Sequence, residues 1–216
     1  MVDDSGNPAG GPAGPAEPNT ALTRPHTRTL RDGATVLIRR IGPADEPALA
    51  RFHAGLSEQT VRQRYFLAVK LDQRVEHARL ARICASDPAH DLVLVALAAD
   101  DVVGVGRVSR AVENGNRAEF ALLLADAWQG RGLGTLLMGE LLSAARAGGV
   151  RFMSGETLAH NVGMTRIAER YGFSVNGPNR EGVVHFWQDL GPADAAQPPS
   201  GLPPADQREA GGPVSS

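Results

Sequence analysis

The sequence predicts a mixed α/β domain whose central sheet has about six to seven strands flanked by helices. Two observations support this prediction. Apolar runs of strand length recur between short turn sequences, as in "DLVLVALAA" (91–99) and "RAEFALLLA" (117–125). Other segments repeat their apolar residues with the 3.6-residue period of a helix, most clearly residues 131–147. Because both kinds of segment alternate along the chain, we expect them to pack in layers around one core.

Residues 28–190 are expected to form the folded unit. Both ends of the 216-residue chain, 1–27 and 191–216, are rich in Pro, Gly, Ala and Asp and contain almost no large apolar residues. Such segments cannot offset the entropy that ordering costs, so we expect disordered tails.

Charge and cysteine content narrow the class of protein. The formal net charge of −2 gives no general attraction to nucleic acid or to a membrane surface. No apolar stretch approaches the ~20 residues of a membrane span, and the start "MVDDSGNPAGG" is unlike a signal peptide. The single cysteine, Cys84, excludes an internal disulfide and favours a reducing compartment. We therefore expect a cytoplasmic protein.

The folded unit begins with the β-branched strand "ATVLIRRI" (34–41). Helix-start residues after it predict three helices, of which the last has Asp72 as its N-cap. These helices span 42–56, 57–65 and 71–84.

A hairpin follows the helices. The buried strand 91–99 turns at Asp100-Asp101 into its partner strand 102–110. The sequence "ENGN" (113–116) then turns the chain into the strand that ends in "LLLA".

The second half starts with the leucine-rich helix 131–147, which Gly148-Gly149 closes. Asn161 is the expected N-cap of a second helix, which Gly172 ends. The remaining predicted elements are a strand at 150–158, that second helix at 161–172, and strands at 173–175 and 182–190.

Glycine fills three of five positions in "GRGLG" (130–134), in the connection between a predicted strand and a predicted helix. The first turn of a helix has N–H groups without partners and a positive dipole end, so a phosphate can sit on amides that carry no side chain. The alternative is a tight turn that binds nothing. A nucleoside triphosphate loop and a dinucleotide fingerprint both fit worse, because their spacings are absent.

At this point the sequence resembles the GCN5-related N-acetyltransferases (the GNAT superfamily). The segment "QGRGLG" matches the family signature Gln/Arg-x-x-Gly-x-Gly/Ala. The preceding "LLL" (122–124), the leucine-rich helix, the segment "NVGMTRIAERYGF" (161–173) and the order of elements agree with it. The resemblance covers about 34–190 and implies the GNAT fold, with a sheet splayed between the fourth and fifth predicted strands.

The likeness is strongest to the acetyltransferase domain of bacterial Pat-type protein lysine acetyltransferases. The segments that carry it are 52–66, 118–134 and 155–173. It implies transfer of an acetyl group from acetyl-CoA to an amine, with protein lysine as the expected acceptor and no metal. Two alternatives stay open, namely a small-molecule amine acetyltransferase and a non-catalytic acyl-CoA-binding sensor module. Oligomeric state stays open as well.

The resemblance also implies cofactor-binding residues. The pyrophosphate of acetyl-CoA would lie on backbone amides after the fourth strand, the pantetheine would run along that strand as an added strand does, and an asparagine would contact the arm. The residues are Leu122, Leu123, Leu124, Gln129, Gly130, Arg131, Gly132, Leu133, Gly134, Thr135 and Asn161.

Glu119 is the candidate general base. A lysine ammonium has a pKa near ~10.4, so a group that removes its proton aids attack on a thioester. In the Pat-type pattern a glutamate holds this place; the alternative is an outward-facing glutamate on an ordinary strand. Many GNAT enzymes have, at the position of Ala168, a tyrosine that protonates the departing thiolate. Tyr171, three residues later, is expected to pack in the core.

Other polar residues receive structural interpretations. His53 is expected to be a core histidine, Cys84 a small buried residue, and Tyr65 an anchor for a helix end. Arg62 and Arg64 are expected on a solvated face or as guides for an acidic acceptor. The histidines show no metal-ligand spacing.

Overall fold

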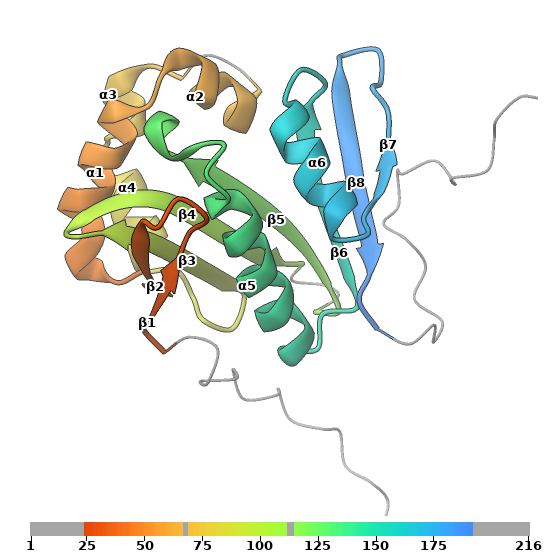
Figure 1. The fold of residues 1–216 in the computed structure, drawn as a ribbon, viewed down its shortest axis with the longest axis horizontal. Coiled ribbons are helices and arrows are strands. Elements are labelled where there is room, and N and C mark those ends of the chain that lie inside the picture. Colours follow the sequence, from red (N-terminus) through yellow and green to blue (C-terminus); the bar gives the residue numbers. More distant parts are fainter. Residues whose placement is uncertain (1–23, 67–68, 112–114, 192–216) are drawn as a thin grey trace, which may run out of the picture.

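The computed structural model describes residues 24–66, 69–111 and 115–191. Within them, eight strands form one sheet in the order β1-β2-β3-β4-β5-β6-β8-β7 (Figure 1). All neighbouring strands are antiparallel except the parallel pair β5 and β6. The strands are β1 His26–Thr29, β2 Thr35–Arg40, β3 Asp91–Ala98, β4 Asp101–Arg110, β5 Arg117–Leu124, β6 Phe152–Leu158, β7 Ser174–Asn176 and β8 Val183–Asp189.

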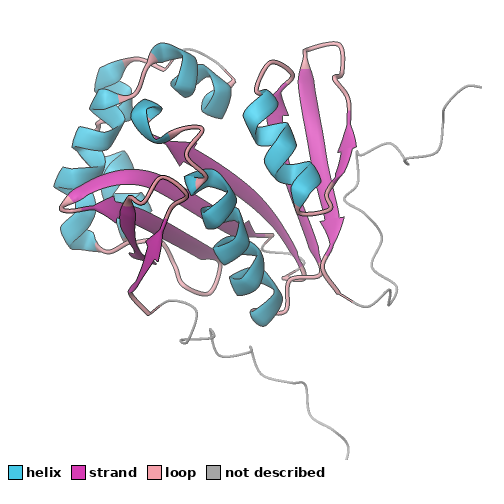
Figure 2. Ribbon diagram, in the orientation of Figure 1, coloured by secondary structure: helices cyan, strands magenta, loops and turns pink. Residues whose placement is uncertain are grey.

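Helices cover both faces of this sheet, which confirms the predicted mixed α/β architecture (Figure 2). The α-helices are α1 Glu46–Gly55, α2 Glu58–Tyr65, α3 Leu71–Arg74, α4 His77–Cys84, α5 Leu133–Ala147 and α6 Val162–Arg170. Two short 3₁₀ helices, η2 Pro43–Asp45 and η3 Asp126–Trp128, precede α1 and the glycine run.

The alternation of β3 separates two hydrophobic cores. Leu94 and Ala96 point to the α5 face, where Leu137 packs among fully buried residues. Val93 and Val95 point to the opposite face and pack with Leu49 of α1 and Leu80 of α4. A strand that is buried on both sides explains why this segment is apolar at nearly every position.

The sequence pattern does not predict the first strand, β1. β1 begins at His26, inside the segment predicted as a tail, and its sequence "HTRT" shows no apolar alternation because three of its four residues are exposed. It pairs with β2 at the edge of the sheet and raises the strand count above the predicted number. The remainder of both predicted tails, 1–23 and 192–216, lies outside the described residues.

The predicted helix 71–84 is wrong as a single element. It divides into α3 and α4 because Glu76 has an extended ψ of 124°. Arg74 turns inward there, and its guanidinium donates to the carbonyls of His53 and Leu56. Lys70, not Asp72, occupies the N-cap position of α3.

Two further boundaries differ from the prediction. The β3–β4 turn lies at Ala99-Asp100, one residue earlier, because Asp101 already pairs with Ala98. The long helix starts at Leu133, since Gly132 is left-handed with φ of 95°. Half of the predicted "ENGN" turn, residues 113 and 114, lies outside the described residues, whereas the predicted N-cap Asn161 and the predicted helix start at Ser57 are confirmed.

The parallel strands β5 and β6 form a fork. Their pairing covers Arg117 to Glu119 against Phe152 to Ser154 and then stops. Figure 1 shows the two strands close together at one end and apart at the other. Beyond the branch point, a Cβ on Gly155 would lie 2.6 Å from the Phe120 ring, so only glycine lets that ring pack against β6. The splay predicted between the fourth and fifth predicted strands is confirmed.

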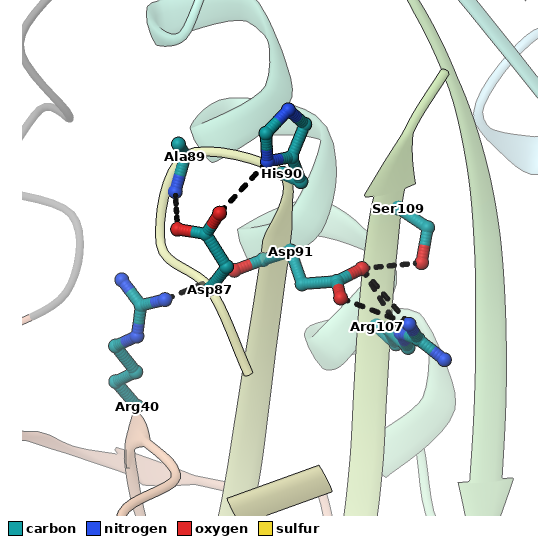
Figure 3. A network of polar contacts seen from close by, with 7 residues as sticks. All are labelled: Arg40, Asp87, Ala89, His90, Asp91, Arg107 and Ser109. Carbon is teal, nitrogen blue, oxygen red and sulfur yellow. Dashed lines mark hydrogen bonds and ion pairs between the residues drawn. The ribbon is translucent and has the colours of Figure 1, made fainter. Parts of the chain in front are cut away.

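A polar network holds the strands beside this fork (Figure 3). The Asp91 carboxylate accepts hydrogen bonds from the Arg107 guanidinium and the Ser109 hydroxyl, both on β4. The Arg40 guanidinium donates to the Asp91 carbonyl oxygen at 2.9 Å. The network therefore occupies Arg107 and Ser109, two polar side chains of β4 next to β5.

His53 is a core histidine, as predicted. Its side chain is 3% exposed, packs edge-on to Phe52 and leaves Nδ1 without a hydrogen bond. Burial, together with the positive charges of Arg79, Arg74 and Arg64, lowers its pKa from 6.5 to about 4.

This depressed pKa predicts a stability loss in mild acid. Below pH 6.5 His53 becomes protonated in the unfolded chain, whereas in the folded chain it becomes protonated only near pH 4. The contribution of neutral His53 to the free energy of unfolding is complete above the pKa of the unfolded chain. It declines as the pH falls, by about 2 kcal/mol between pH 7 and pH 5. Urea unfolding at both pH values should therefore show a weaker pH dependence in His53→Leu. The exposed-histidine control His160→Gln should follow the wild type, and an unchanged slope in His53→Leu would contradict the assignment.

Candidate active site

A cleft of about 1130 Å³ passes through the open part of the fork. Its walls come from β5, β6, α2, α6, the glycine run and the turn between β1 and β2. Glu119 and the cofactor-binding residues proposed from the resemblance line this cleft, with the exception of Leu133. The side chain of Leu133 is fully buried in the core beneath α5 and points away from the cleft.

The glycine run presents a row of free backbone amides. Within the described part of the chain, the amides of residues 130–135 donate no hydrogen bond. Gly130 and Gly132 have φ values of 73° and 95°, and a Cβ on either would meet no atom within 4 Å. The space above these amides is therefore open, and the 15-residue helix α5 directs its positive end into it.

Glycine is required at position 134 for a different physical reason, namely helix packing. It is buried, and a Cβ there would lie 2.9 Å from Cδ1 of Ile167 on α6. The third glycine thus lets α6 pack closely on the start of α5, which places α6 along one wall of the cleft.

Arg131 is held beside the amides by two contacts. Its guanidinium stacks 4.2 Å above the Trp128 ring and forms an ion pair with Asp32 from the β1–β2 turn. The hydrogen bond from Arg131 lowers the pKa of Asp32. Strand β1 therefore has a role, because the turn that joins it to β2 carries the carboxylate that orients this arginine.

The start of the glycine run is fixed to α2. Asp126 accepts hydrogen bonds from the backbone and hydroxyl of Ser57 and from the Thr60 hydroxyl. Burial raises the pKa of Asp126, but these hydrogen bonds outweigh it and the pKa lies below its usual value. Gln129 also donates to Thr60 at 2.9 Å. Neither Asp126 nor Thr60 was singled out from the sequence, because their partners lie 66 to 69 residues away.

β5 provides an open strand edge along the cleft. Leu122 and Leu124 are partly buried toward the α5 face, and Leu123 is 8% exposed toward the other. Because β6 no longer pairs with this part of β5, the edge of β5 is free to bind an extended, amide-bearing chain.

Asn161 lines the cleft while it caps α6. Its side-chain oxygen accepts from the Met164 amide at 3.2 Å, and its Nδ2 donates to the buried Thr157 hydroxyl at 3.0 Å. The N-cap interpretation is confirmed; contact with a bound arm stays a prediction.

Glu119 stands at the branch point of the fork, exposed to the cleft. Its cross-strand neighbour Ser109 and the nearby Arg107 are both occupied by Asp91 (Figure 3). Among the described residues no hydrogen bond or ion pair reaches the Glu119 carboxylate. A carboxylate without a hydrogen bond or ion pair in an open cleft is available to accept a proton.

The two positions considered for a general acid differ in their surroundings. Ala168 is fully buried in the core. Tyr171 packs against the core as expected and also lines the cleft, and its hydroxyl donates to the Thr135 carbonyl at 2.7 Å. That proton is thus engaged in joining α6 to α5.

Arg64 is half-buried in the cleft wall, so the expected solvated face is wrong for this residue. Burial lowers its pKa, while the nearby Glu119 charge acts in the opposite direction. Tyr65 does anchor the end of α2: Arg79 donates to its hydroxyl, and the Arg64 guanidinium lies 5.1 Å from its ring centre.

Several cleft residues were not identified from the sequence. They come together only through strand register and helix packing, which no local pattern records. These residues are Asp32, Gln63, Phe66, Glu156, Arg166 and Arg170.

The described residues show neither a metal site nor a membrane-spanning helix. They contain no group of three or more His, Cys, Asp or Glu side chains placed to hold a metal ion. None of their helices is both long and apolar enough to cross a membrane. Cys84 is a buried free thiol, and burial raises its pKa to about 11.

Comparisons with known proteins agree on one family. A family model of the acetyltransferase (GNAT) domain matches residues 35–174. The acetyltransferase Pat of Mycolicibacterium smegmatis is 30% identical over 176 residues, 81% of this chain and 51% of Pat, so the chain spans about half the length of this relative. A Pseudomonas aeruginosa acetyltransferase is 32% identical over 149 residues, 67% of this chain and 78% of that protein.

Solved structures share the fold. The GNAT domain of S. lividans PAT superposes with a TM-score of 0.70 at 26% identity, covering 76% of this chain and 96% of that one. The Salmonella typhimurium protein yncA, solved with its cofactor acetyl-CoA, has a TM-score of 0.56 at 21% identity and covers 75% of this chain and 98% of its own. The chain therefore belongs to the GNAT family of acetyltransferases.

Proposed function

We propose that this chain uses acetyl-CoA, the co-substrate of its family, to acetylate the side-chain amine of protein lysine. The observation that carries the proposal is the position of Glu119. The fork opens at this residue, so one unpartnered carboxylate faces the cleft between an open strand edge and a row of free amides.

The cleft fits a long ligand with an anionic part and an amide-bearing arm. The amides of residues 130–135 would bind the pyrophosphate, and Arg131 would add positive charge beside it. The edge of Leu122, Leu123 and Leu124 would bind the pantetheine arm, and Asn161 would contact it from α6. The ligand supplies the acetyl thioester, and the chain supplies its alignment.

Glu119 would accept the proton of the incoming lysine ammonium. At pH 7 only about one lysine in 10³ is neutral, so proton removal limits attack on the thioester carbon. A backbone N–H of the segment 122–124 would donate to the carbonyl oxygen as negative charge develops on it. A thiol with a pKa near ~8.5 leaves as thiolate with little help, which suits a site where the Tyr171 hydroxyl is already engaged.

The Pat-type relatives support protein lysine as the acceptor, in direct attack within a ternary complex. The unpaired Cys84 thiol fits the reducing cytoplasm that we propose as the location.

Thiol release from acetyl-CoA tests this function. The assay uses the full chain carrying Lys70→Arg, because Lys70 is the only lysine in the sequence and self-acetylation of a lysine side chain is thereby excluded. Release is expected with a lysine-containing peptide and not without it. Release with small amines alone would make the chain a small-molecule acetyltransferase. Binding of coenzyme A without release under any acceptor would make it an acyl-CoA sensor.

A further inference from the structure

Glu156 lies across the fork from Glu119. The register pairs Glu119 with Ser154, and Glu156 follows two residues later on β6, so both glutamates point to the same face of the sheet. Both side chains line the cleft. Two carboxylates from two diverging strands thus border the same opening.

His185 holds the second carboxylate in place. It is the cross-strand partner of Glu156 on β8, and its Nδ1 lies 3.0 Å from Oε1 of Glu156. Within the described part of the chain no hydrogen bond or ion pair reaches Oε2, and the Glu156 side chain is 46% exposed. One oxygen is therefore anchored while the other is free to accept a hydrogen bond.

The opening is completed by the end of α2. Phe66 is an exposed aromatic residue that lines the cleft at the C-cap of this helix. Arg64 is the arginine of the same helix that lines the cleft, and its charge interacts with Glu119. An apolar ring that lines the same cleft as two carboxylates suits a ligand with a methylene stem and a cationic tip.

From this arrangement we infer that Glu156, positioned by His185, binds the ammonium group of the acceptor before Glu119 takes its proton. The inference rests on the proposed function and adds a residue that selects cationic amines. Glu156 attracts the charged form of the amine, so it contributes to ground-state binding and does not assist deprotonation.

Acceptor saturation kinetics test this role. Thiol release is measured at pH 7 with a lysine peptide and with the same peptide carrying an aminooxy group, which is uncharged at this pH. Glu156→Gln is expected to raise KM for the lysine peptide about tenfold, as loss of one charge-assisted hydrogen bond does. Its kcat should not fall, its KM for acetyl-CoA should not change, and its KM for the aminooxy peptide should stay at the wild-type value.

Matched variants separate binding from structure. Glu169→Gln alters an exposed glutamate of α6 outside the cleft and should match the wild type. His185→Leu should raise KM for the lysine peptide about threefold, and His185→Gln, which keeps a hydrogen-bond donor, should restore it.

The outcomes are distinct. An unchanged KM for the lysine peptide in Glu156→Gln overturns the inference alone, and an equal rise for both peptides shows a structural effect and also overturns it. No thiol release by the wild type with either peptide removes the proposed function and this inference together.

Discussion

Glu119→Gln is expected to lower kcat for acetylation of a lysine peptide by about 10²- to 10⁴-fold, the usual contribution of a general base. Glutamine keeps the size of the side chain but cannot accept a proton. The KM for acetyl-CoA should change little, because the free amides of residues 130–135 lie on the loop and not at the branch point of the fork. Steady-state thiol release with varied acetyl-CoA and peptide measures both quantities.

The pH dependence gives an independent readout. As the pH rises toward the pKa of lysine, the neutral fraction of the acceptor grows about tenfold per pH unit, so the activity of Glu119→Gln should recover in alkaline solution. Glu58→Gln is the control, because Glu58 is an exposed glutamate at the start of α2 outside the cleft. A kcat for Glu119→Gln within twofold of wild type would exclude the carboxylate as the base.

Gly132→Ala is expected to raise the dissociation constant for coenzyme A roughly 100-fold, equal to the loss of one or two charge-assisted hydrogen bonds. Gly132 has φ of 95°, and its missing side chain leaves the space above the amides open. An alanine methyl group would project into that space and strain the left-handed backbone, which turns the amides away from an anion. Isothermal calorimetry with coenzyme A measures the change.

Gly149→Ala controls for backbone strain. Gly149 has φ of 81°, also with open space around its missing Cβ, and it lies at the other end of α5. Both variants should lose similar stability in thermal unfolding, but only Gly132→Ala should lose affinity. Equal affinities for the two variants would mean that the amides at Gly132 do not hold the pyrophosphate.

Local patterns were sufficient for much of the fold. The apolar runs of β3 and β5 predicted strands because both of their faces are covered by helices. The N-cap Asn161 and the helix start at Ser57 were predicted correctly because a cap acts on an amide three residues away. β1 was not predicted, because an exposed edge strand needs no apolar residues and so shows no apolar pattern.

The features of the site also separate into those that short sequence patterns predict and those that depend on the tertiary structure. The sequence by itself determined the ridge of glycine amides at the start of α5 and a glutamate within β5, because these depend on residue type and short spacing. Only the tertiary structure decided that the sheet parts at Glu119, that Asp32 orients Arg131, that Gly134 serves helix packing, and that Glu156 faces the same opening. These contacts join residues distant in the chain, and their geometry is set by strand register and by the packing of both cores.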